Sequence, residues 1–213
     1  MKYTEYRYLW PPRPDRKIPP TNLDQLERMR WWGQAKFNGT LCTMYVTPDG
    51  DTLAMGRHGP DHKLAWQPGP AWQAFVNTLA PGWHVFVGEL LNDKVKGGPR
   101  GVIVLFDMLV EDGEYLVGTT LRERFHRLTE MLNLYNRDAR LELTHREYNE
   151  GVWLVENRAR AFTEWFAALD RAPDMIEGLV FKSPDGRLQP CGRSASNSAW
   201  QVKCRRPTAN KSF

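Results

Sequence analysis

The chain has 213 residues, with 29 lysines and arginines against 25 aspartates and glutamates, so its formal net charge is +4. With 41% hydrophobic and 25% charged residues, its composition is that of an ordinary globular protein and excludes bulk disorder. No apolar run reaches the roughly 18 residues that a membrane-spanning helix needs, and the N-terminus lacks the apolar stretch of a signal peptide. The three cysteines fit neither a disulfide framework nor a Cys-x-x-Cys zinc site, so we expect a protein of a reducing compartment, the cytoplasm. We also expect a monomer with no membrane partner.

The hydrophobic patterns predict one domain over 1–213, with residues 1–20 as an extended, proline-rich arm. In chain order they predict a helix over 23–29, a hairpin over 41–46 and 52–55, a helix over 70–79, and strands over 83–91 and 102–110. A helix capped by Thr120, a helix over 157–170, and strands over 176–181 and 200–204 complete the chain. Because strands and helices do not alternate regularly, the fold class is α+β, with mainly antiparallel sheets and flanking helices.

One lysine precedes a glycine in a way that suits a nucleophile. Lys36 stands in Lys-x-Asn-Gly, between a predicted helix and a predicted strand, and Gly39 allows the backbone turn that would present it. A lysine amine attacks phosphorus only when it is neutral, and nearby cations favour that state. The alternative interpretation is an ordinary surface lysine before a turn.

Two glutamates lie in apolar strands. Glu89 stands in Val-Gly-Glu-Leu-Leu and Glu177 in Ile-Glu-Gly-Leu-Val-Phe-Lys. A carboxylate in such a run is costly unless it is paired, hydrogen-bonded or bound to a metal. Together with Asp107 they suggest a Mg²⁺ or sugar-hydroxyl site; the alternative is glutamates that point to solvent from edge strands.

Cations gather near the end of the chain. Lys182 follows the Glu177 strand, and Lys203 and Arg205 are spaced to project from one face of the last strand. They indicate a clamp for a triphosphate or a nucleic-acid backbone. The alternative is a solvated basic edge that discourages aggregation.

With these motifs in this order, the sequence resembles the covalent nucleotidyltransferases, which include ATP-dependent DNA and RNA ligases and mRNA capping enzymes. The resemblance rests on short motifs in the family's order: Lys36-Phe37-Asn38-Gly39, Gly56-Arg57-His58-Gly59, Gly88-Glu89-Leu90, Leu105-Phe106-Asp107-Met108-Leu109, Glu177-Gly178-Leu179-Val180-Phe181-Lys182 and Lys203-Cys204-Arg205. It is closest to a minimal, phage-like ATP-dependent polynucleotide ligase.

The resemblance implies a ligase that joins 3′-hydroxyl and 5′-phosphate ends of DNA or RNA held on a complementary strand. Lys36 would carry AMP from ATP, with Mg²⁺ or Mn²⁺ held by Glu89 and Glu177. The implied catalytic residues are Lys36, Glu89, Glu177, Lys182 and Lys203. The implied nucleotide-binding residues are Gln34, Lys36, Arg57, Glu89, Phe106, Lys182, Lys203 and Arg205. Phe106 would stack on the adenine and Gln34 would read its edge.

The sequence departs from the family at several points. Gln34 replaces a glutamate common in DNA ligases, Asn38 replaces the commoner aspartate, and Arg205 replaces a lysine. Only eight residues follow Arg205, so we expect no C-terminal OB domain and expect nucleic acid to bind the domain's own surface. The residues expected to bind it are Arg57, Lys94, Lys96, Arg100 and Arg193.

Two other functions remain open at this stage. A GTP-dependent RNA-capping guanylyltransferase would use the same lysine chemistry. A catalytically inactive relative would keep the fold and bind nucleic acid. Labelling with GTP in place of ATP separates the first from a ligase, and failure of Lys36 to take up AMP would support the second.

Overall fold

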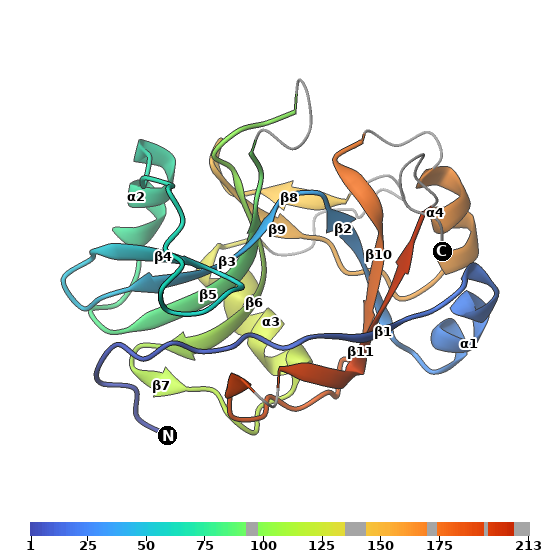
Figure 1. Ribbon diagram of the computed structural model, residues 1–213, viewed down its shortest axis with the longest axis horizontal. Helices are drawn as coiled ribbons and strands as arrows, with labels where there is room; N and C mark the ends of the chain where they lie inside the picture. Colours follow the sequence, from blue (N-terminus) through green and yellow to red (C-terminus); the bar gives the residue numbers. More distant parts are fainter. Residues whose placement is uncertain (93–97, 135–143, 170–173, 194–195, 207–213) are drawn as a thin grey trace.

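Two β-sheets form the centre of the molecule (Figure 1). The computed structural model describes residues 1–92, 98–134, 144–169, 174–193 and 196–206. The four-stranded sheet has the order β1-β11-β10-β2, and its strands are Arg13–Lys17, Asn197–Arg205, Ile176–Lys182 and Trp32–Phe37.

The larger sheet has seven strands. Six follow the order β4-β3-β5-β6-β9-β8, with bounds Thr52–Gly56, Thr40–Val46, His84–Leu90, Ile103–Glu111, Val152–Val155 and His145–Glu147. The short β7 (Glu114–Tyr115) pairs with β6 beside this row. Among the described strands, β1 with β11 and β6 with β9 are parallel pairs, and the other pairs are antiparallel. The predicted α+β class is confirmed.

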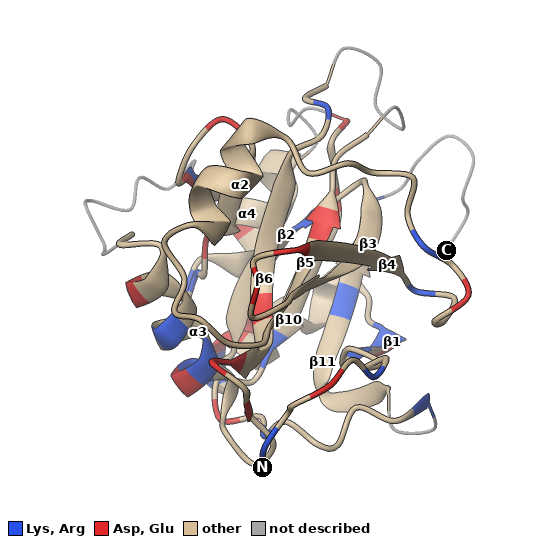
Figure 2. Ribbon diagram, turned by 90° about the vertical axis from the view of Figure 1, so that its left-hand side faces the viewer, with Lys and Arg blue, Asp and Glu red and all other residues tan. Residues whose placement is uncertain are grey.

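Four short α-helices flank the sheets in the described part of the chain: α1 (Leu23–Arg28), α2 (Pro70–Val76), α3 (Leu121–Met131) and α4 (Phe162–Ala168), with a 3₁₀ turn at Pro20–Asn22 before α1. The predicted cap of α3 is confirmed, because Thr120 and Glu123 form a reciprocal capping box. The outer surface of α3 carries both basic and acidic residues (Figure 2). No helix in the described ranges is long and apolar enough to cross a membrane.

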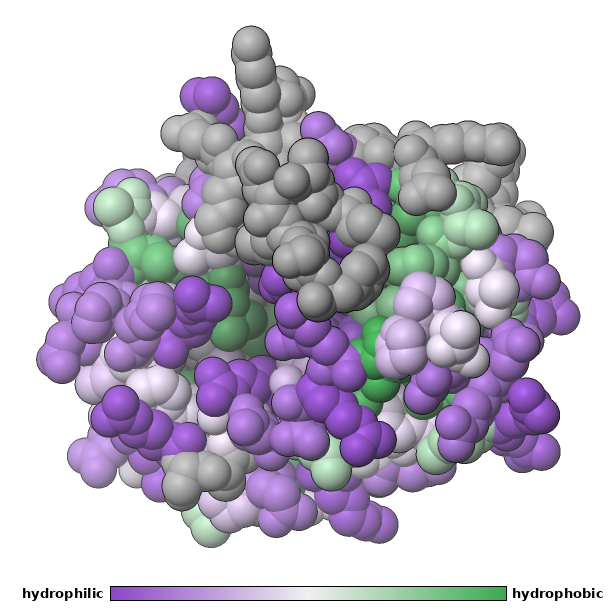
Figure 3. All heavy atoms as spheres, turned by 45° about the vertical axis from the view of Figure 1, so that its right-hand side comes forward, coloured by the Kyte–Doolittle hydropathy of each residue, from purple (hydrophilic) through white to green (hydrophobic). Residues whose placement is uncertain are grey.

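The buried apolar residues form a cluster to which both sheets and all four described α-helices contribute. The strand predicted over 102–110 is β6, an interior strand of the larger sheet, and Ile103, Val104 and Leu105 are fully buried on it. Predicted helices over 70–79 and 157–170 are confirmed but shorter, as α2 and α4. The side of the molecule that carries the four-stranded sheet is mostly hydrophilic at its surface, with small apolar areas (Figure 3).

Strand β2 corrects one expectation, since Lys36 lies within a strand rather than in a connection between a helix and a strand. The strand was missed because Gly33 and Ala35 interrupt its apolar pattern. The structure explains the glycine: a Cβ at position 33 would lie 3.1 Å from the rings of Phe162, Phe181 and Trp165. Aromatic side chains of α4 and β10 therefore require a minimal residue there.

Candidate active site

A cavity of about 860 Å³ opens between the two sheets. Its lining residues come from both sheets and from the N-terminal arm. It brings together every nucleotide-binding and catalytic residue predicted from the sequence: Gln34, Lys36, Arg57, Glu89, Phe106, Glu177, Lys182, Lys203 and Arg205. These residues are scattered over most of the chain, and the fold gathers them at one place.

Lys36 is half-buried on β2 and points into this cavity. Its Nζ forms an ion pair with Oε1 of Glu177, and both side chains are 19% exposed. Arg205 Nη2 lies 3.6 Å from the same carboxylate oxygen. One carboxylate therefore faces two cations, and the candidate nucleophile has a proton acceptor in direct contact.

A β-bulge aims Glu177 into the cavity. Opposite β2, Ile176 pairs with Phe37 and Gly178 pairs with Lys36, so Glu177 is the extra residue of β10. The bulge puts Glu177 on the same side as Val180 and Lys182, which simple alternation would not do. Gly178 has φ of +147°, and a Cβ there would lie 2.3 Å from the carbonyl oxygen of Cys204. The glycine of the Glu-Gly motif is thus required by backbone conformation and by close approach.

A second glycine brings the two sheets together beside the nucleophile. The N–H of Gly39 donates to Oε1 of Glu89 at 3.1 Å. A Cβ at position 39 would lie 2.5 Å from the carbonyl oxygen of Leu90. Gly39 thus lets β5 approach the end of β2, and this contact holds the Glu89 carboxylate at the cavity.

Lys182 is the buried cation of the site, at 3% exposure. Its Nζ lies 4.5 Å from the centroid of the Phe106 ring, over the ring face. The pKa of Lys182 is lowered to about 8: burial is the main cause, the charge of Asp107 opposes the shift, and the charge of Arg124 adds a smaller lowering. Its ammonium therefore titrates close to neutral pH.

On β11, Lys203 and Arg205 project from one face into the cavity. Partial burial lowers the pKa of Lys203, and the charges of Arg205, Lys36, Lys17 and Arg13 add to this shift. The positive charges of these side chains repel one another, so this part of the cavity attracts an anion such as a phosphate.

Gln34 is buried at 3% exposure, and its Nε2 donates to Oδ1 of Asn157 at 2.7 Å. This bond directs the amide of Gln34, and sequence reasoning did not identify Asn157. Arg13, His58, His62 and Lys63 also line the cavity and were not among the predicted nucleotide-binding residues. His58 stands in a quoted motif but was given no role, and motif order carried no signal for the other three, because they reach the cavity through tertiary contacts.

Asp107 has a different environment from the one expected. It forms a buried, two-pronged ion pair with Arg124 of α3, with Nε–Oδ1 at 2.8 Å and Nη2–Oδ2 at 3.1 Å, and it does not line the cavity. The sequence-based suggestion that Asp107 joins a metal or sugar site is therefore corrected. Its apolar strand carries a carboxylate because a buried arginine neutralises it.

The residues expected to bind nucleic acid are spread over the surface. Arg57 is exposed at the cavity and donates from Nε to Nε2 of His58 at 3.2 Å. Arg193 is exposed and lies over the Trp10 ring, 5.5 Å from its centroid, and Arg100 is exposed. Lys94 and Lys96 lie outside the described residues.

A metal ion would find oxygen donors here. Glu89 and Glu177 line the cavity together, and Mg²⁺ is commonly held by one or two carboxylates plus substrate phosphates. Within the described ranges, no group of three or more His, Cys, Asp or Glu side chains forms a closed metal site. The donor set therefore fits a cation that shares its ligands with a bound polyphosphate.

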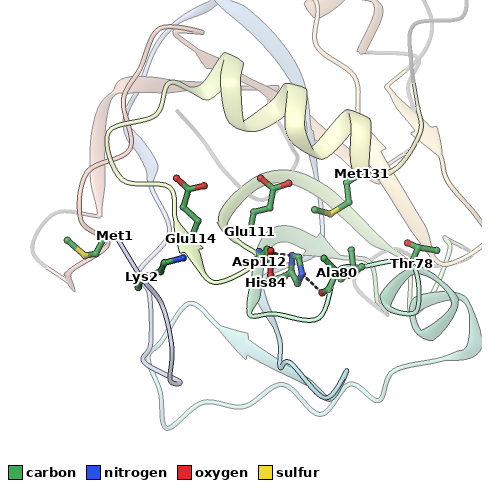
Figure 4. Close-up of a pocket in the computed structure, with 10 residues that line it drawn as sticks. Met1, Lys2, Thr78, Ala80, His84, Glu111, Asp112, Glu114 and Met131 are labelled. Atoms are coloured by element: carbon green, nitrogen blue, oxygen red, sulfur yellow. Dashed lines mark hydrogen bonds between the residues drawn. The ribbon is translucent and has the colours of Figure 1, made fainter.

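A second cavity, of about 690 Å³, lies elsewhere on the molecule (Figure 4). Glu111, Asp112, Glu114 and His84 line it. His84 Nε2 is 2.9 Å from the carbonyl oxygen of Ala80, and its Nδ1 accepts the N–H of Asp112 at 3.4 Å. None of the sequence-predicted site residues lines this cavity.

Neither a protein-family model nor a curated protein matches the sequence. Solved structures do match the fold. The ligase domain of LigD from M. tuberculosis is 21% identical with a TM-score of 0.64, and the match covers 94% of this chain and 61% of that chain. A mycobacterial DNA ligase D complexed with ATP and MES is 20% identical with a TM-score of 0.64, over 94% of this chain and 62% of that chain.

The ATP-dependent DNA ligase from bacteriophage T7, in complex with ATP, is 13% identical with a TM-score of 0.51, over 89% of this chain and 66% of that chain. The chain spans about three fifths of the length of the two LigD structures. The likeness is one of fold.

Proposed function

We propose that this chain, which has the fold of the adenylation domain of ATP-dependent DNA ligases, forms a covalent lysyl-AMP at Lys36. The observation that carries the proposal is the convergence of Lys36, Glu177, Lys182, Lys203 and Arg205 on one cavity large enough for a nucleotide. Their charges suit a triphosphate, and one of them is a lysine in contact with a carboxylate.

In the proposed first step, the neutral amine of Lys36 attacks the α-phosphorus of ATP. The new N–P bond forms as the P–O bond to the β-phosphate breaks, and pyrophosphate leaves with that electron pair. Glu177 contacts Nζ and is placed to accept the proton that the ammonium must lose. Lys182, Lys203 and Arg205 stabilise negative charge on the phosphates from fixed positions in the cavity.

The nucleoside would lie on the side of the cavity lined by Gln34, Phe106 and Val155. Gln34 is oriented by Asn157, and its remaining amide atoms are available to a base edge. Phe106 would stack on the base, and Glu89 would accept a ribose hydroxyl or share Mg²⁺ with Glu177. When bound, Mg²⁺ would neutralise part of the charge on the phosphates.

The later steps would join nucleic-acid ends. An oxygen of a 5′-phosphate attacks the lysyl-AMP, so the N–P bond breaks and a 5′-adenylylated end forms. A 3′-hydroxyl then attacks the 5′-phosphorus and AMP leaves. The exposed Arg57, Arg100 and Arg193 are candidates for backbone contacts, which would make binding sensitive to salt. We propose a nicked duplex with DNA or RNA strands as substrate, because a complementary strand aligns the ends.

The test is the intact mass of the protein after incubation with Mg²⁺ and either ATP or GTP. A pyrophosphate-treated sample is run in parallel, because the purified protein could already carry AMP. We expect a gain of one AMP in the wild type and none in Lys36→Ala. Lys2→Ala, which removes an exposed lysine outside the cavity, should keep the adduct. A GMP adduct would indicate the capping reaction, and no adduct in any sample would refute the proposal.

A further inference from the structure

The N-terminal arm forms part of the cavity wall. Pro12, Arg13, Pro14 and Asp15 line the cavity together with the strands of both sheets. In Figure 1 the arm runs across the molecule from the larger sheet to the edge of the four-stranded sheet. It is therefore in a position to contribute side chains to a ligand bound between the sheets.

Hydrogen bonds fix the arm at both ends of this path. The Tyr8 hydroxyl donates to the carbonyl oxygen of Gly56 at 2.7 Å, next to Arg57, and the N–H of Leu9 donates to the Tyr45 hydroxyl at 2.8 Å. Further along, the N–H of Ile18 donates to the carbonyl oxygen of Lys203 at 2.9 Å. The wall is held by both sheets, so its side chains are preorganised for a ligand.

Arg13 is the cation that this wall brings to the cavity. Its Nε donates to Oδ1 of Asn197 at 2.7 Å, which orients the guanidinium. Among the ion pairs that the structure describes, none includes Arg13. The charge of Arg13 contributes to lowering the pKa of Lys203, so it acts on the same region of the cavity.

Arg13 and Lys36 line the same cavity from different parts of the four-stranded sheet. Arg13 is in register with Asn197 at the start of β11. Lys36 pairs with Gly178, which pairs with Arg205 at the end of β11. Lys36 is on β2 and Arg13 is on β1, and these are the opposite edges of the four-stranded sheet β1-β11-β10-β2. In phosphoryl transfer the attacking and leaving atoms lie roughly in line on opposite sides of phosphorus. If the proposed function is correct, a leaving group expelled by Lys36 therefore departs away from β2.

We propose that Arg13 binds the pyrophosphate portion of ATP, and stabilises pyrophosphate as it leaves when Lys36 is adenylylated. This inference rests on the proposed function. The bond from the α-phosphorus to the β-phosphate breaks, and its electron pair adds negative charge to the pyrophosphate. Because Nε of Arg13 donates to Asn197, the other N–H groups of the guanidinium can donate to phosphate oxygens. Lys203 is on β11, which lies between the strands that carry Arg13 and Lys36, and it serves the α-phosphate.

The experiment compares Arg13→Ala with Arg16→Ala. Arg16 is an exposed arginine of the same strand that does not line the cavity, so it matches the change in charge. Binding of inorganic pyrophosphate with Mg²⁺ is measured by calorimetry in both variants and in the wild type. We expect Arg13→Ala to weaken the affinity by about tenfold and Arg16→Ala by less than about twofold. Thermal melting confirms that the variants are folded.

A second readout uses protein that already carries AMP. Reversal by pyrophosphate should need an about tenfold higher pyrophosphate concentration in Arg13→Ala for half-maximal rate. Transfer of AMP to a 5′-phosphate end should be unchanged, since pyrophosphate is absent from that step. Equal pyrophosphate affinity in all three proteins would overturn the role of Arg13. A defect confined to the transfer step would overturn it too, in favour of a nucleic-acid contact. Failure of the proposed function is separate, because it appears as loss of the AMP adduct in the wild type.

Discussion

The two cavities of this molecule differ in the balance of their charges. Seven lysines and arginines and three carboxylates line the cavity between the sheets. One lysine and three carboxylates line the second cavity, where Arg127 of α3 neutralises Glu111 at 2.8 Å and Glu114 at 3.3 Å. The second cavity resembles a surface recess whose charges are balanced locally. The first holds an excess of cations around a lysine, which a polyphosphate would balance.

An excess of positive charge, rather than cavity size, distinguishes the candidate site from the second cavity. The two volumes, about 860 and 690 Å³, are similar. Holding several cations together costs self-repulsion. At Lys203 this repulsion adds to burial, the main cause of its lowered pKa.

The largest expected effect on stability comes from the ion pair that supports the first cavity. Arg124→Met removes a fully buried partner and leaves the Asp107 carboxylate unpaired beside Lys182. We expect the free energy of unfolding to fall by about 3–5 kcal/mol. Chemical denaturation measures it. A loss below about 1 kcal/mol would contradict the view that this pair is a buried structural element.

Substitution of Gly178, the glycine at the β-bulge, should lower the free energy of unfolding nearly as much. Gly178→Ala forces a Cβ to within 2.3 Å of a backbone oxygen at a φ of +147°. We expect a loss of about 3 kcal/mol or more in unfolding free energy, and loss of AMP uptake, because Glu177 is re-aimed. The matched control is Gly118→Ala, at φ of +88° with nothing within 4 Å of the added Cβ. Gly118→Ala should lower the free energy of unfolding by only about 1–2 kcal/mol and leave AMP uptake intact.

The pH dependence of nucleotide binding tests the buried lysine. Because the pKa of Lys182 is lowered to about 8, its ammonium is present below pH 8 and is lost as the pH rises through that value. In the Lys36→Ala background, which cannot form the adduct, we expect the Kd for ATP to increase several-fold from pH 7.5 to 9.5. Adding Lys182→Met should weaken binding at pH 7.5 and remove most of the pH dependence. Unchanged pH dependence would place Lys182 away from the bound phosphates.

The smallest effect is expected in the second cavity. Arg127→Ala removes ion pairs whose members are 26–55% exposed. We expect a change within about 1 kcal/mol in unfolding free energy and no change in AMP uptake. A clear loss of AMP uptake would show that the second cavity influences the first.

The sequence predicted the fold class and most strands, because alternation marks β3, a continuous apolar run marks β6, and shorter apolar runs mark β5 and β10. It also singled out the residues that converge on the main cavity. It missed β2, whose small residues serve aromatic packing, and it misassigned Asp107, whose buried partner lies in a later helix. Asn157 was missed, and Arg13 was considered only as a nucleic-acid contact of the arm, because their placement at the cavity depends on contacts between distant segments.

The most direct test of the central claim is to locate the AMP by peptide-level mass spectrometry. Both Lys36 and Lys182 line the cavity, and burial lowers the pKa of Lys182 to about 8, so Lys182 is a competing amine at neutral pH. We expect AMP on Lys36 alone, since Lys36 contacts Glu177 and Lys182 lies over the Phe106 ring. AMP on Lys182, or on no lysine of this cavity, would contradict the account.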